Sequence, residues 1–433
     1  MIRQNFNADW TVEKGDGNSR MNSFLGNTQT KTVHLPYDAM IHEARTTDTK
    51  NGAQTGFYPG GEYIFQKHFT APQVWQGKPV SLVFEGVYQT ALVYLNGWLL
   101  TRNVNGYAEF TVEAGPYLKY GADNLLKVIA DNSLEPNSRW YTGSGIYRPV
   151  RLLVGNKVYL PQDTVRITTR EADEDFALLD VTAQVQSAST VTERVTLQQT
   201  ICREGTAVLT DRQNLLLQPG ESRTVSFRYC VDSPALWSPE NPNLYTSTMQ
   251  VLEGEEELDR EETGFGIRTL SIDAAHGVRI NGQTVKLRGA CIHHDNGILG
   301  AATLPDAEER RIRQLKEAGF NAIRSSHHPA GRALLDACDR YGVLVMDELS
   351  DVWNVRKNPY DYALYFEQDW KPTIQKMVAK DYNHPSVILY CVGNEISEAG
   401  SESGAETNRR LCNTFRELDP TRYTTNALNG LIG

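Results

Sequence analysis

Apolar residues recur with a period of two through much of the first third of the chain. Apolar residues occupy every second position in two neighbouring segments, Val80–Phe84 and Ala91–Leu95, and the second segment ends at Asn96-Gly97. Such a pair between alternating segments is a strong signal of a β-hairpin, because both residues tolerate positive φ. Since later apolar segments repeat the same period of two, we expect residues 1–158 to form a β jelly-roll sandwich.

The period of two continues, with turn signals between short strands, through a second region. Segments 178–185, 195–201 and 225–231 alternate, and Pro219-Gly220 marks a turn between two of them. Many short strands over about 110 residues are typical of an immunoglobulin-like sandwich. We therefore expect residues 159–271 to form such a sandwich and to act mainly as a spacer.

The pattern changes after Asn281-Gly282, where apolar strands begin to alternate with amphipathic helices. Short loops between strictly alternating strands and helices indicate parallel β/α units. Strands are expected at 285–292, 321–324, 343–347, 387–392 and 423–426, and helices at 305–318, 330–341, 372–382 and 406–418. Because an eight-unit barrel would need about as many units again, residues 272–433 are expected to form the first half of a (β/α)8 TIM barrel.

Composition limits the partners and the location of the protein. A formal charge of −10 argues against nucleic-acid or anionic membrane partners, since these require clustered Lys and Arg. The first ten residues contain no apolar stretch of signal-peptide length, and no later segment reaches the roughly 18 apolar residues of a membrane span, so we expect a cytoplasmic protein. The six cysteines show no CxxC spacing and therefore indicate neither a disulfide framework nor a zinc site.

Polar residues gather where the predicted barrel strands end, which is where barrel enzymes hold their active sites. The groups are His293-His294-Asp295, Arg324–His328, Asp347-Glu348 and Asn394-Glu395. Glycoside hydrolysis uses two carboxyl groups, one of which protonates the leaving oxygen. Glu395 suits that acid, and Asn394 beside it suits a contact with the sugar 2-hydroxyl.

Several of these residues also suit structural roles. Arg324 fits either a substrate contact or a buried ion pair with Asp347 or Glu348. The paired histidines fit substrate contacts, structural hydrogen bonds or metal ligation. Trp353 fits either a platform for a sugar face or a core aromatic residue. Spacing alone decides none of these alternatives.

A series of motifs along the whole chain resembles glycoside hydrolase family 2. Those in the second and third domains are Gly264–Arg268, Ile280-Asn281-Gly282, Leu287-Arg288-Gly289, Asn321–His327, Asp347-Glu348, Asn383–Val387 and Gly393-Asn394-Glu395. Those in the first domain are Leu35-Pro36-Tyr37-Asp38, Tyr94-Leu95-Asn96-Gly97 and Gly145-Ile146-Tyr147-Arg148. The resemblance implies a jelly-roll sugar-binding domain, an immunoglobulin-like sandwich and a (β/α)8 barrel, acting as an exo-glycosidase that retains anomeric configuration.

The resemblance also implies roles for individual residues. Glu395 resembles the acid/base, and Asn394 the residue that holds the 2-hydroxyl. His293 and His327 resemble the sugar-contacting histidines of the β-galactosidase branch. Asp131 resembles the carboxylate that the first domain inserts into the site in that branch, and it otherwise suits a turn residue that caps its own backbone.

The sequence departs from the family pattern in two respects. The family nucleophile is a Glu at the end of the seventh barrel strand, and because this sequence ends earlier, it contains no residue to which we assign that role. Glu348 is the alternative second carboxyl, although the resemblance argues against it. The magnesium ligands of well-known bacterial members are a Glu and a His shortly after the third strand, where this chain has Val352 and Asn354. These two residues argue against a metal there, and no cofactor is expected to be required.

These observations predict the N-terminal part of a retaining exo-β-glycosidase that hydrolyses terminal non-reducing β-D-sugars from an oligosaccharide or glycoside. β-Galactosidase is the preferred activity and β-glucuronidase the second; the fragment alone is expected to be inactive, and homo-oligomerisation of the full-length enzyme is left open. An alternative of another class is a non-catalytic carbohydrate-binding protein. A third is an unstable truncation, since half a barrel exposes parallel strands that need covering.

Overall fold

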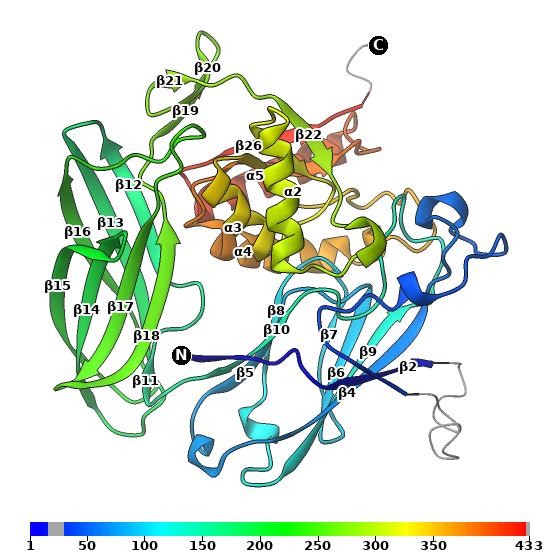
Figure 1. The fold of residues 1–433 in the computed structure, drawn as a ribbon, viewed down its shortest axis with the longest axis horizontal. Helices are drawn as coiled ribbons and strands as arrows, with labels where there is room; N and C mark the ends of the chain where they lie inside the picture. The colour runs from blue at the N-terminus through cyan, green and yellow to red at the C-terminus, as the bar shows by residue number, and fades with distance from the viewer. Residues whose placement is uncertain (16–29, 430–433) are drawn as a thin grey trace.

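The computed structural model describes residues 1–15 and 30–429, which form a jelly roll, an immunoglobulin-like sandwich and half of a TIM barrel (Figure 1). The jelly roll consists of two facing antiparallel sheets, with strand orders β1-β10-β5-β8 and β3-β2-β4-β9-β6-β7. Its elements are β1 (Ile2–Asn5), β2 (Trp10–Gly15), β3 (Lys31–Val33), η1 (Met40–His42), η2 (Gly52–Thr55), β4 (Gly61–Thr70), η3 (Gln73–Trp75), β5 (Val80–Phe84), β6 (Thr90–Leu95), β7 (Trp98–Asn103), β8 (Phe110–Glu113), η4 (Gly115–Tyr117), β9 (Asp123–Asn132) and β10 (Val150–Val154). The fold class expected from the sequence is confirmed.

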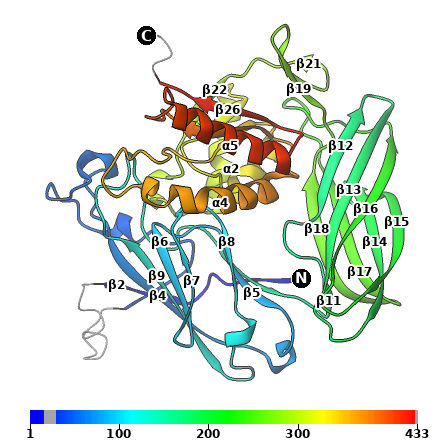
Figure 2. The ribbon, with the colours of Figure 1, turned by 180° about the vertical axis from the view of Figure 1, so that it is seen from behind.

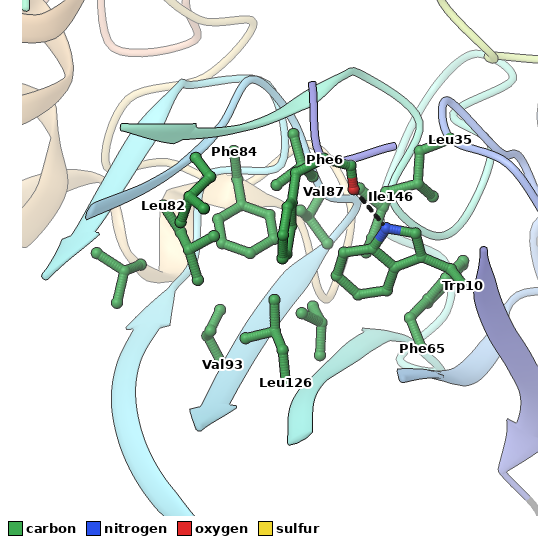
Figure 3. Close-up of a cluster of buried hydrophobic side chains, with 14 of the residues drawn as sticks. Phe6, Trp10, Leu35, Phe65, Leu82, Phe84, Val87, Val93, Leu126 and Ile146 are labelled. Carbon is green, nitrogen blue, oxygen red and sulfur yellow. Dashed lines mark hydrogen bonds between the residues drawn. The ribbon is translucent and has the colours of Figure 1, made fainter. Parts of the chain in front are cut away.

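The core of the jelly roll lies between its two sheets (Figure 3). Alternation along each strand places one row of side chains inside, where Phe65 and Phe84 are fully buried. Trp10 is also fully buried, and its indole Nε1 donates a hydrogen bond of 2.8 Å to the carbonyl oxygen of Phe6. Because this core is continuous, the sheets form a firm base for the loops at one end of the domain.

The predicted hairpin at Asn96-Gly97 is confirmed. Asn96 has φ 52° and Gly97 has φ 89°, and the turn joins β6 to β7 with Leu95 opposite Trp98. Two positive φ angles in a two-residue loop match the right-handed twist of the paired strands. The local sequence thus predicts this turn, and Asn96 Nδ2 also donates to the carbonyl of Tyr117 and to Asn124, at 2.9 and 2.8 Å, which holds it from outside the hairpin.

The second domain consists of two antiparallel sheets that enclose their own apolar core. One sheet has the order β11-β13-β12, with β16 also paired to β13, and the other has the order β15-β14-β17-β18. The strands are β11 (Val158–Tyr159), β12 (Arg166–Ala172), β13 (Phe176–Ser187), β14 (Glu193–Arg203), β15 (Thr206–Leu217), β16 (Ser222–Asp232), β17 (Tyr245–Glu253) and β18 (Glu256–Phe265). This domain lies beside the other two in both views (Figures 1 and 2).

The barrel half is a parallel sheet of order β22-β23-β24-β25-β26, preceded by a small antiparallel sheet. Its elements are β19 (Leu270–Asp273), β20 (Gly277–Ile280), β21 (Gln283–Thr284), β22 (Gly289–Ile292), η5 (Gly297–Leu299), α2 (Pro305–Glu317), β23 (Ala322–Ser325), α3 (Arg332–Tyr341), β24 (Leu344–Glu348), η6 (Tyr362–Leu364), α4 (Phe366–Asp381), β25 (Val387–Asn394), α5 (Glu402–Leu418) and β26 (Tyr423–Ala427). Because β22 and β26 end the sheet, both edges lack a further strand among the described residues.

The start of α4 differs from the expectation. The helix begins at Phe366, so that Pro372 lies inside it and does not open it. A proline at this depth removes one backbone hydrogen bond, which usually ends a helix. Here the first turns are held by packing, since Phe366 is fully buried and Trp370 nearly so. Tertiary burial therefore outweighs the local preference of the proline.

The first domain covers the C-terminal ends of the parallel strands, and the second domain contacts their opposite ends. Arg148 of the first domain donates a 3.1 Å hydrogen bond from Nη2 to the carbonyl of Pro329, shortly after β23. Arg268, which follows β18, donates from Nη2 to the carbonyl of Val387 at the start of β25, at 2.8 Å. Among the described helices, none is long and apolar enough to cross a membrane.

Candidate active site

Strand β25 delivers Asn394 and Glu395 to the end of the barrel half that faces the first domain. Asn394 is buried at 3% exposure, whereas the Glu395 side chain is 43% exposed. Glu395 has φ 45°, and its backbone N–H donates to the carbonyl of Ala427 at 2.7 Å. A left-handed backbone is unusual for Glu and is retained where the surroundings enforce it, often at functional sites. The strand thus ends on a carboxylate that is fixed at its backbone and open at its side chain.

Asp351, in the loop after β24, is the centre of a hydrogen-bond network beside Glu395. Its two carboxylate oxygens accept from Nε and Nη2 of Arg139, at 3.0 and 2.7 Å. Asp351 Oδ1 also accepts two further hydrogen bonds, from Asn394 Nδ2 at 2.8 Å and from Lys357 Nζ at 2.9 Å. Burial raises the pKa of the Asp351 carboxyl, but the hydrogen bonds from Arg139 and Asn394 and the charge of Lys357 outweigh it, so the pKa lies below its usual value.

Asn394 is oriented from both ends of its amide. Arg324 Nη2 donates to Asn394 Oδ1 at 2.8 Å, while Asn394 Nδ2 donates to Asp351. Lys357 Nζ also donates to the backbone carbonyl of Asn394 at 2.7 Å. With both ends engaged, the amide has one orientation, which prepares it to meet a ligand without reorganisation.

Arg324 forms the buried ion pair that the sequence left open. Its Nε donates to Glu348, and His327 Nδ1 lies 2.8 Å from the other carboxylate oxygen of Glu348. Glu348 is fully buried. Since both of its oxygens are engaged, Glu348 is occupied as a structural partner and is not free to serve as a second reacting carboxyl.

The predicted histidines His293 and His327 lie together against Trp140 of the first domain. The ring of His293 stacks on Trp140 with centroids 5.0 Å apart at 26°, and His327 meets it edge-on at 5.5 Å. Trp140 Nε1 donates to the hydroxyl of Tyr107 at 3.0 Å, which fixes the indole. Burial and the charge of His327 lower the pKa of His293, so its imidazole is neutral near pH 7.

The neighbouring histidines, His294 and His328, are structural. Burial lowers the pKa of His294 to about 3, and its Nε2 donates to the carbonyl of Thr142 at 2.9 Å. His328 stacks on Tyr107 with centroids 4.0 Å apart at 9°, and burial holds its pKa well below the usual value. These neutral rings pack the interface between the jelly roll and the barrel half.

Asp131 is not brought to this network. It lies near the end of β9, and its Oδ1 accepts hydrogen bonds from the backbone N–H and hydroxyl of Ser133, at 3.0 and 2.6 Å. The structure therefore places Asp131 as a turn residue that caps its own backbone. The first domain instead contributes Arg139 and Trp140, from the segment between β9 and β10.

Sequence reasoning missed Arg139, Trp140, Asp351 and Lys357. Two signals pointed near them: Arg139 and Trp140 shortly precede the Gly145–Arg148 motif, and Asp351 follows the polar end of the third barrel strand. Neither signal predicts where these side chains point, because both segments are loops and show no repeating pattern of apolar residues.

Trp353 and Val352 are part of the interior, whereas Asn354, the other residue where some family members hold magnesium, is exposed. Trp353 is fully buried and its Nε1 donates to the carbonyl of Val392 at 2.9 Å, so it is a core aromatic residue. Val352 is buried and offers no ligand atom, and Asn354 uses its backbone N–H to donate to Glu398 at 2.8 Å. Residues 1–15 and 30–429 hold no group of three or more His, Cys, Asp or Glu side chains that suits a metal ion. The residues at this position therefore do not fit a magnesium site.

The arrangement suits proton transfer next to a polyhydroxylated ligand. An open carboxylate can give or take a proton, and an oriented amide can bind a hydroxyl. The imidazole of His293, stacked on the indole of Trp140, offers an apolar face with polar edges. Together with a sandwich domain docked on parallel strand ends, these features define a glycoside-hydrolase type of barrel protein.

Comparison with known families agrees with this class. The description "Glycosyl hydrolase 2 galactose-binding domain-like" matches residues 10–186, "Glycosyl hydrolases family 2" matches 158–268, and "Glycosyl hydrolases family 2, TIM barrel domain" matches 274–430. The chain belongs to glycoside hydrolase family 2.

Relatives with different printed activities resemble the chain. The β-galactosidase BoGH2A of Bacteroides ovatus is 37% identical over 94% of this chain and 48% of its own length. A putative β-glucuronidase of Formosa agariphila is 31% identical over 98% of this chain and 40% of its own length. A family 2 crystal structure from Bacteroides cellulosilyticus superimposes with a TM-score of 0.95 at 36% identity, covering 100% of this chain and 56% of that one. The chain thus spans about half the length of the curated relatives it matches.

Proposed function

We propose that the protein containing this chain is a retaining exo-β-glycosidase that removes terminal non-reducing β-D-sugars, with β-galactosides as its preferred substrates. The observation that carries the proposal is the open carboxylate of Glu395 at the end of β25, beside the oriented amide of Asn394. In a retaining hydrolase, such a carboxyl protonates the glycosidic oxygen while a second carboxylate attacks the anomeric carbon. Glu395 then takes a proton from water, which releases the sugar.

The other polar groups have distinct parts in the proposal. Asn394 would bind the 2-hydroxyl, and His293 and His327 would contact further hydroxyls from their neutral or hydrogen-bonded rings. Arg324 would act through Asn394, whose carbonyl oxygen it holds. The two contacts with Ser133 engage only Oδ1 of Asp131, so the role of Asp131 as the inserted carboxylate stays a prediction. The attacking carboxylate is assigned to no residue of this sequence.

The charges around the site favour a neutral sugar over a uronic acid. A glucuronate would bring a carboxylate, which calls for a cation that is free to pair with it. Among the described residues of the network, Arg139 and Lys357 pair with Asp351, and Arg324 pairs with Glu348. Each of these cations contacts a carboxylate, with Asp351 shared by Arg139 and Lys357, and this supports β-galactosidase over β-glucuronidase. The relatives carry either name.

The test is a Glu395→Gln substitution in the longest protein that contains this chain. We expect turnover of β-galactosides with poor leaving groups to fall by about 10²–10⁴-fold, because the leaving oxygen loses its proton donor. Activated aryl galactosides need little protonation and should lose far less.

A nearby exposed carboxylate provides the matched control. Glu402, in the first turn of α5, should tolerate substitution by Gln without a change in either substrate class. Equal losses on good and poor leaving groups in the Glu395 variant would refute the acid assignment. Faster turnover of aryl glucuronides than of aryl galactosides by the unmodified enzyme would select β-glucuronidase instead.

The non-catalytic alternative predicts a different pattern. A carbohydrate-binding protein would bind galactose with the same affinity whether or not Glu395 is replaced, and would release no product from any aryl glycoside. Calorimetric titration with galactose, run beside the turnover assay, separates the two functions.

A further inference from the structure

We infer that Asp351 and Arg139 form a positioning pair, drawn from two domains, that holds Glu395 in a state able to donate its proton. This inference rests on the proposed function, because it concerns how the proposed acid is prepared. Neither Asp351 nor Arg139 is proposed to transfer a proton or to form a bond in the reaction. Both act through the groups that they orient.

The pair is built as a fork across a domain boundary. Arg139 lies in the jelly roll between β9 and β10, and Asp351 lies in the loop after β24 of the barrel half. Two N–H groups of the guanidinium reach the two oxygens of Asp351, at 3.0 and 2.7 Å. A two-pronged contact fixes the plane of both groups as well as the distance between them. The third contact of the guanidinium, made by its remaining nitrogen, therefore points in one set direction.

That third contact is with the proposed acid. Arg139 Nη1 lies 3.3 Å from Glu395 Oε2, a longer hydrogen bond than either of its contacts with Asp351. A cation pressed closely on a carboxylate stabilises its ionised form. By engaging the guanidinium more closely than Glu395 does, Asp351 limits this effect while keeping Arg139 in place.

Asp351 also orients Asn394, the residue proposed to bind the sugar 2-hydroxyl. Its Oδ1 accepts from Asn394 Nδ2 at 2.8 Å and from Lys357 Nζ at 2.9 Å. Two cations, Arg139 and Lys357, thus surround two carboxylates, Asp351 and Glu395. If Asp351 lost its charge, the guanidinium would have Glu395 as its remaining carboxylate partner and would hold it as an ion pair.

This reasoning predicts that the two substitutions are not independent. Asp351→Asn should lower kcat for poor leaving groups on the order of 100-fold, with little change for activated aryl glycosides. Adding Arg139→Gln removes the cation that would capture Glu395. The double variant should therefore recover part of the loss, so that its rate exceeds that of Asp351→Asn alone.

A second bridge between domains serves as the control for a purely structural role. Arg332 of α3 pairs with Glu109 of the jelly roll at 2.7 Å and with Asp163 of the second domain. Arg332→Gln should lower Tm with kcat and KM unchanged for both substrate classes. If Arg139→Gln folds poorly, Arg139→Lys can replace it. This variant keeps the positive charge without the planar guanidinium, so it tests whether the geometry of that group matters.

The outcomes separate the inference from the function on which it rests. If Asp351→Asn behaves like Arg332→Gln, losing stability alone, or if the Asp351 and Arg139 losses simply multiply, the positioning pair is refuted. If the unmodified enzyme hydrolyses no aryl glycoside, the proposed function fails. Crystal structures of the Asp351→Asn and Arg332→Gln proteins then decide the inference: Arg139 closing on Glu395 only in the first supports it, and an unchanged Arg139 overturns it.

Discussion

The two ends of strand β25 are both held by arginines from neighbouring domains, yet they differ in what is left open. At its start, Arg268 donates from Nε to the carbonyl of Pro385 and from Nη2 to that of Val387, at 2.6 and 2.8 Å. At its other end, Arg139 pairs with the side chain of Asp351 and reaches Glu395. The same residue type therefore contacts backbone carbonyls at one end of the strand and carboxylate side chains at the other.

Exposure follows the same division. Arg268 is 9% exposed, and burial together with the charge of Arg422 lowers its pKa to about 9. The side chains of Arg139 and Glu395 are 33% and 43% exposed. A closed end stabilises the junction between domains, whereas an open end keeps donors and acceptors available to a ligand. The exposure of the two ends therefore separates an arginine that packs domains together, Arg268, from one that stands beside the proposed site, Arg139.

The largest effect on stability should come from opening the closed end. Arg268→Met would leave the carbonyls of Pro385 and Val387 without this donor in a buried setting. We expect the free energy of unfolding to fall by about 3 kcal/mol, measured by urea denaturation. Arg260→Met, at an exposed position of β18, should change it by less than about 0.5 kcal/mol. Equal effects of the two substitutions would contradict the comparison.

A smaller effect is expected from the aromatic face at the open end. Trp140→Ala removes the ring on which His293 stacks, so KM for β-galactosides should rise about ten-fold, equivalent to about 1.4 kcal/mol. Trp140→Phe should retain much of the affinity. Trp98 is 66% exposed on β7, and its replacement by Ala should leave KM unchanged. Steady-state kinetics on the three variants would show whether Trp140 matters for binding or only for packing.

The smallest expected effect concerns a carboxyl group that lies at the C-terminal ends of the parallel strands but is shielded from solvent. Asp347 is the last residue but one of β24, before Glu348, and is fully buried. Burial and the charge of Asp381 raise the pKa of Asp347 well above its usual value. The folded protein therefore keeps a proton that the unfolded chain releases above about pH 4, and this group makes the fold less stable as the pH rises towards its folded pKa.

Asp347→Asn imitates the protonated form and should remove that dependence. Relative to the unmodified protein, we expect the variant to gain about 1 kcal/mol in unfolding free energy between pH 5 and pH 6. Asp336→Asn, at an exposed position of α3, is the control and should show no such trend. A difference between Asp347→Asn and the unmodified protein that stays constant with pH would show that Asp347 is ionised in the folded state.

Much of the fold was predictable because its signals are local. The Asn96-Gly97 turn is signalled by two residues that accept positive φ, and strand and helix order follows from the periods of two and 3.6. The start of α4 was not predictable in this way. Pro372 is a local signal to begin a helix, and the burial of Phe366, which overrides it, depends on packing against other elements.

The candidate site was predictable in part for the same reason. Asn394 and Glu395 follow directly on a buried apolar strand, so their place at the strand end is a local consequence of the pattern. Asp131 was placed in the site by resemblance alone, and because its contacts with Ser133 engage only Oδ1, that role stays a prediction. Trp353 was equally suited to two roles, and its full burial together with its hydrogen bond to Val392 distinguishes them.

The sequence by itself determined the three kinds of domain, the order of their elements and the strand ends on which Asn394 and Glu395 lie, because periodicity and turn chemistry act over a few residues. Only the tertiary structure decided that Arg139 and Trp140 of the jelly roll enter the barrel end and that Asp351 meets them there. These contacts join loops that are far apart in the sequence and carry no period of their own. Their direction arises only when the cores of two domains have formed and docked.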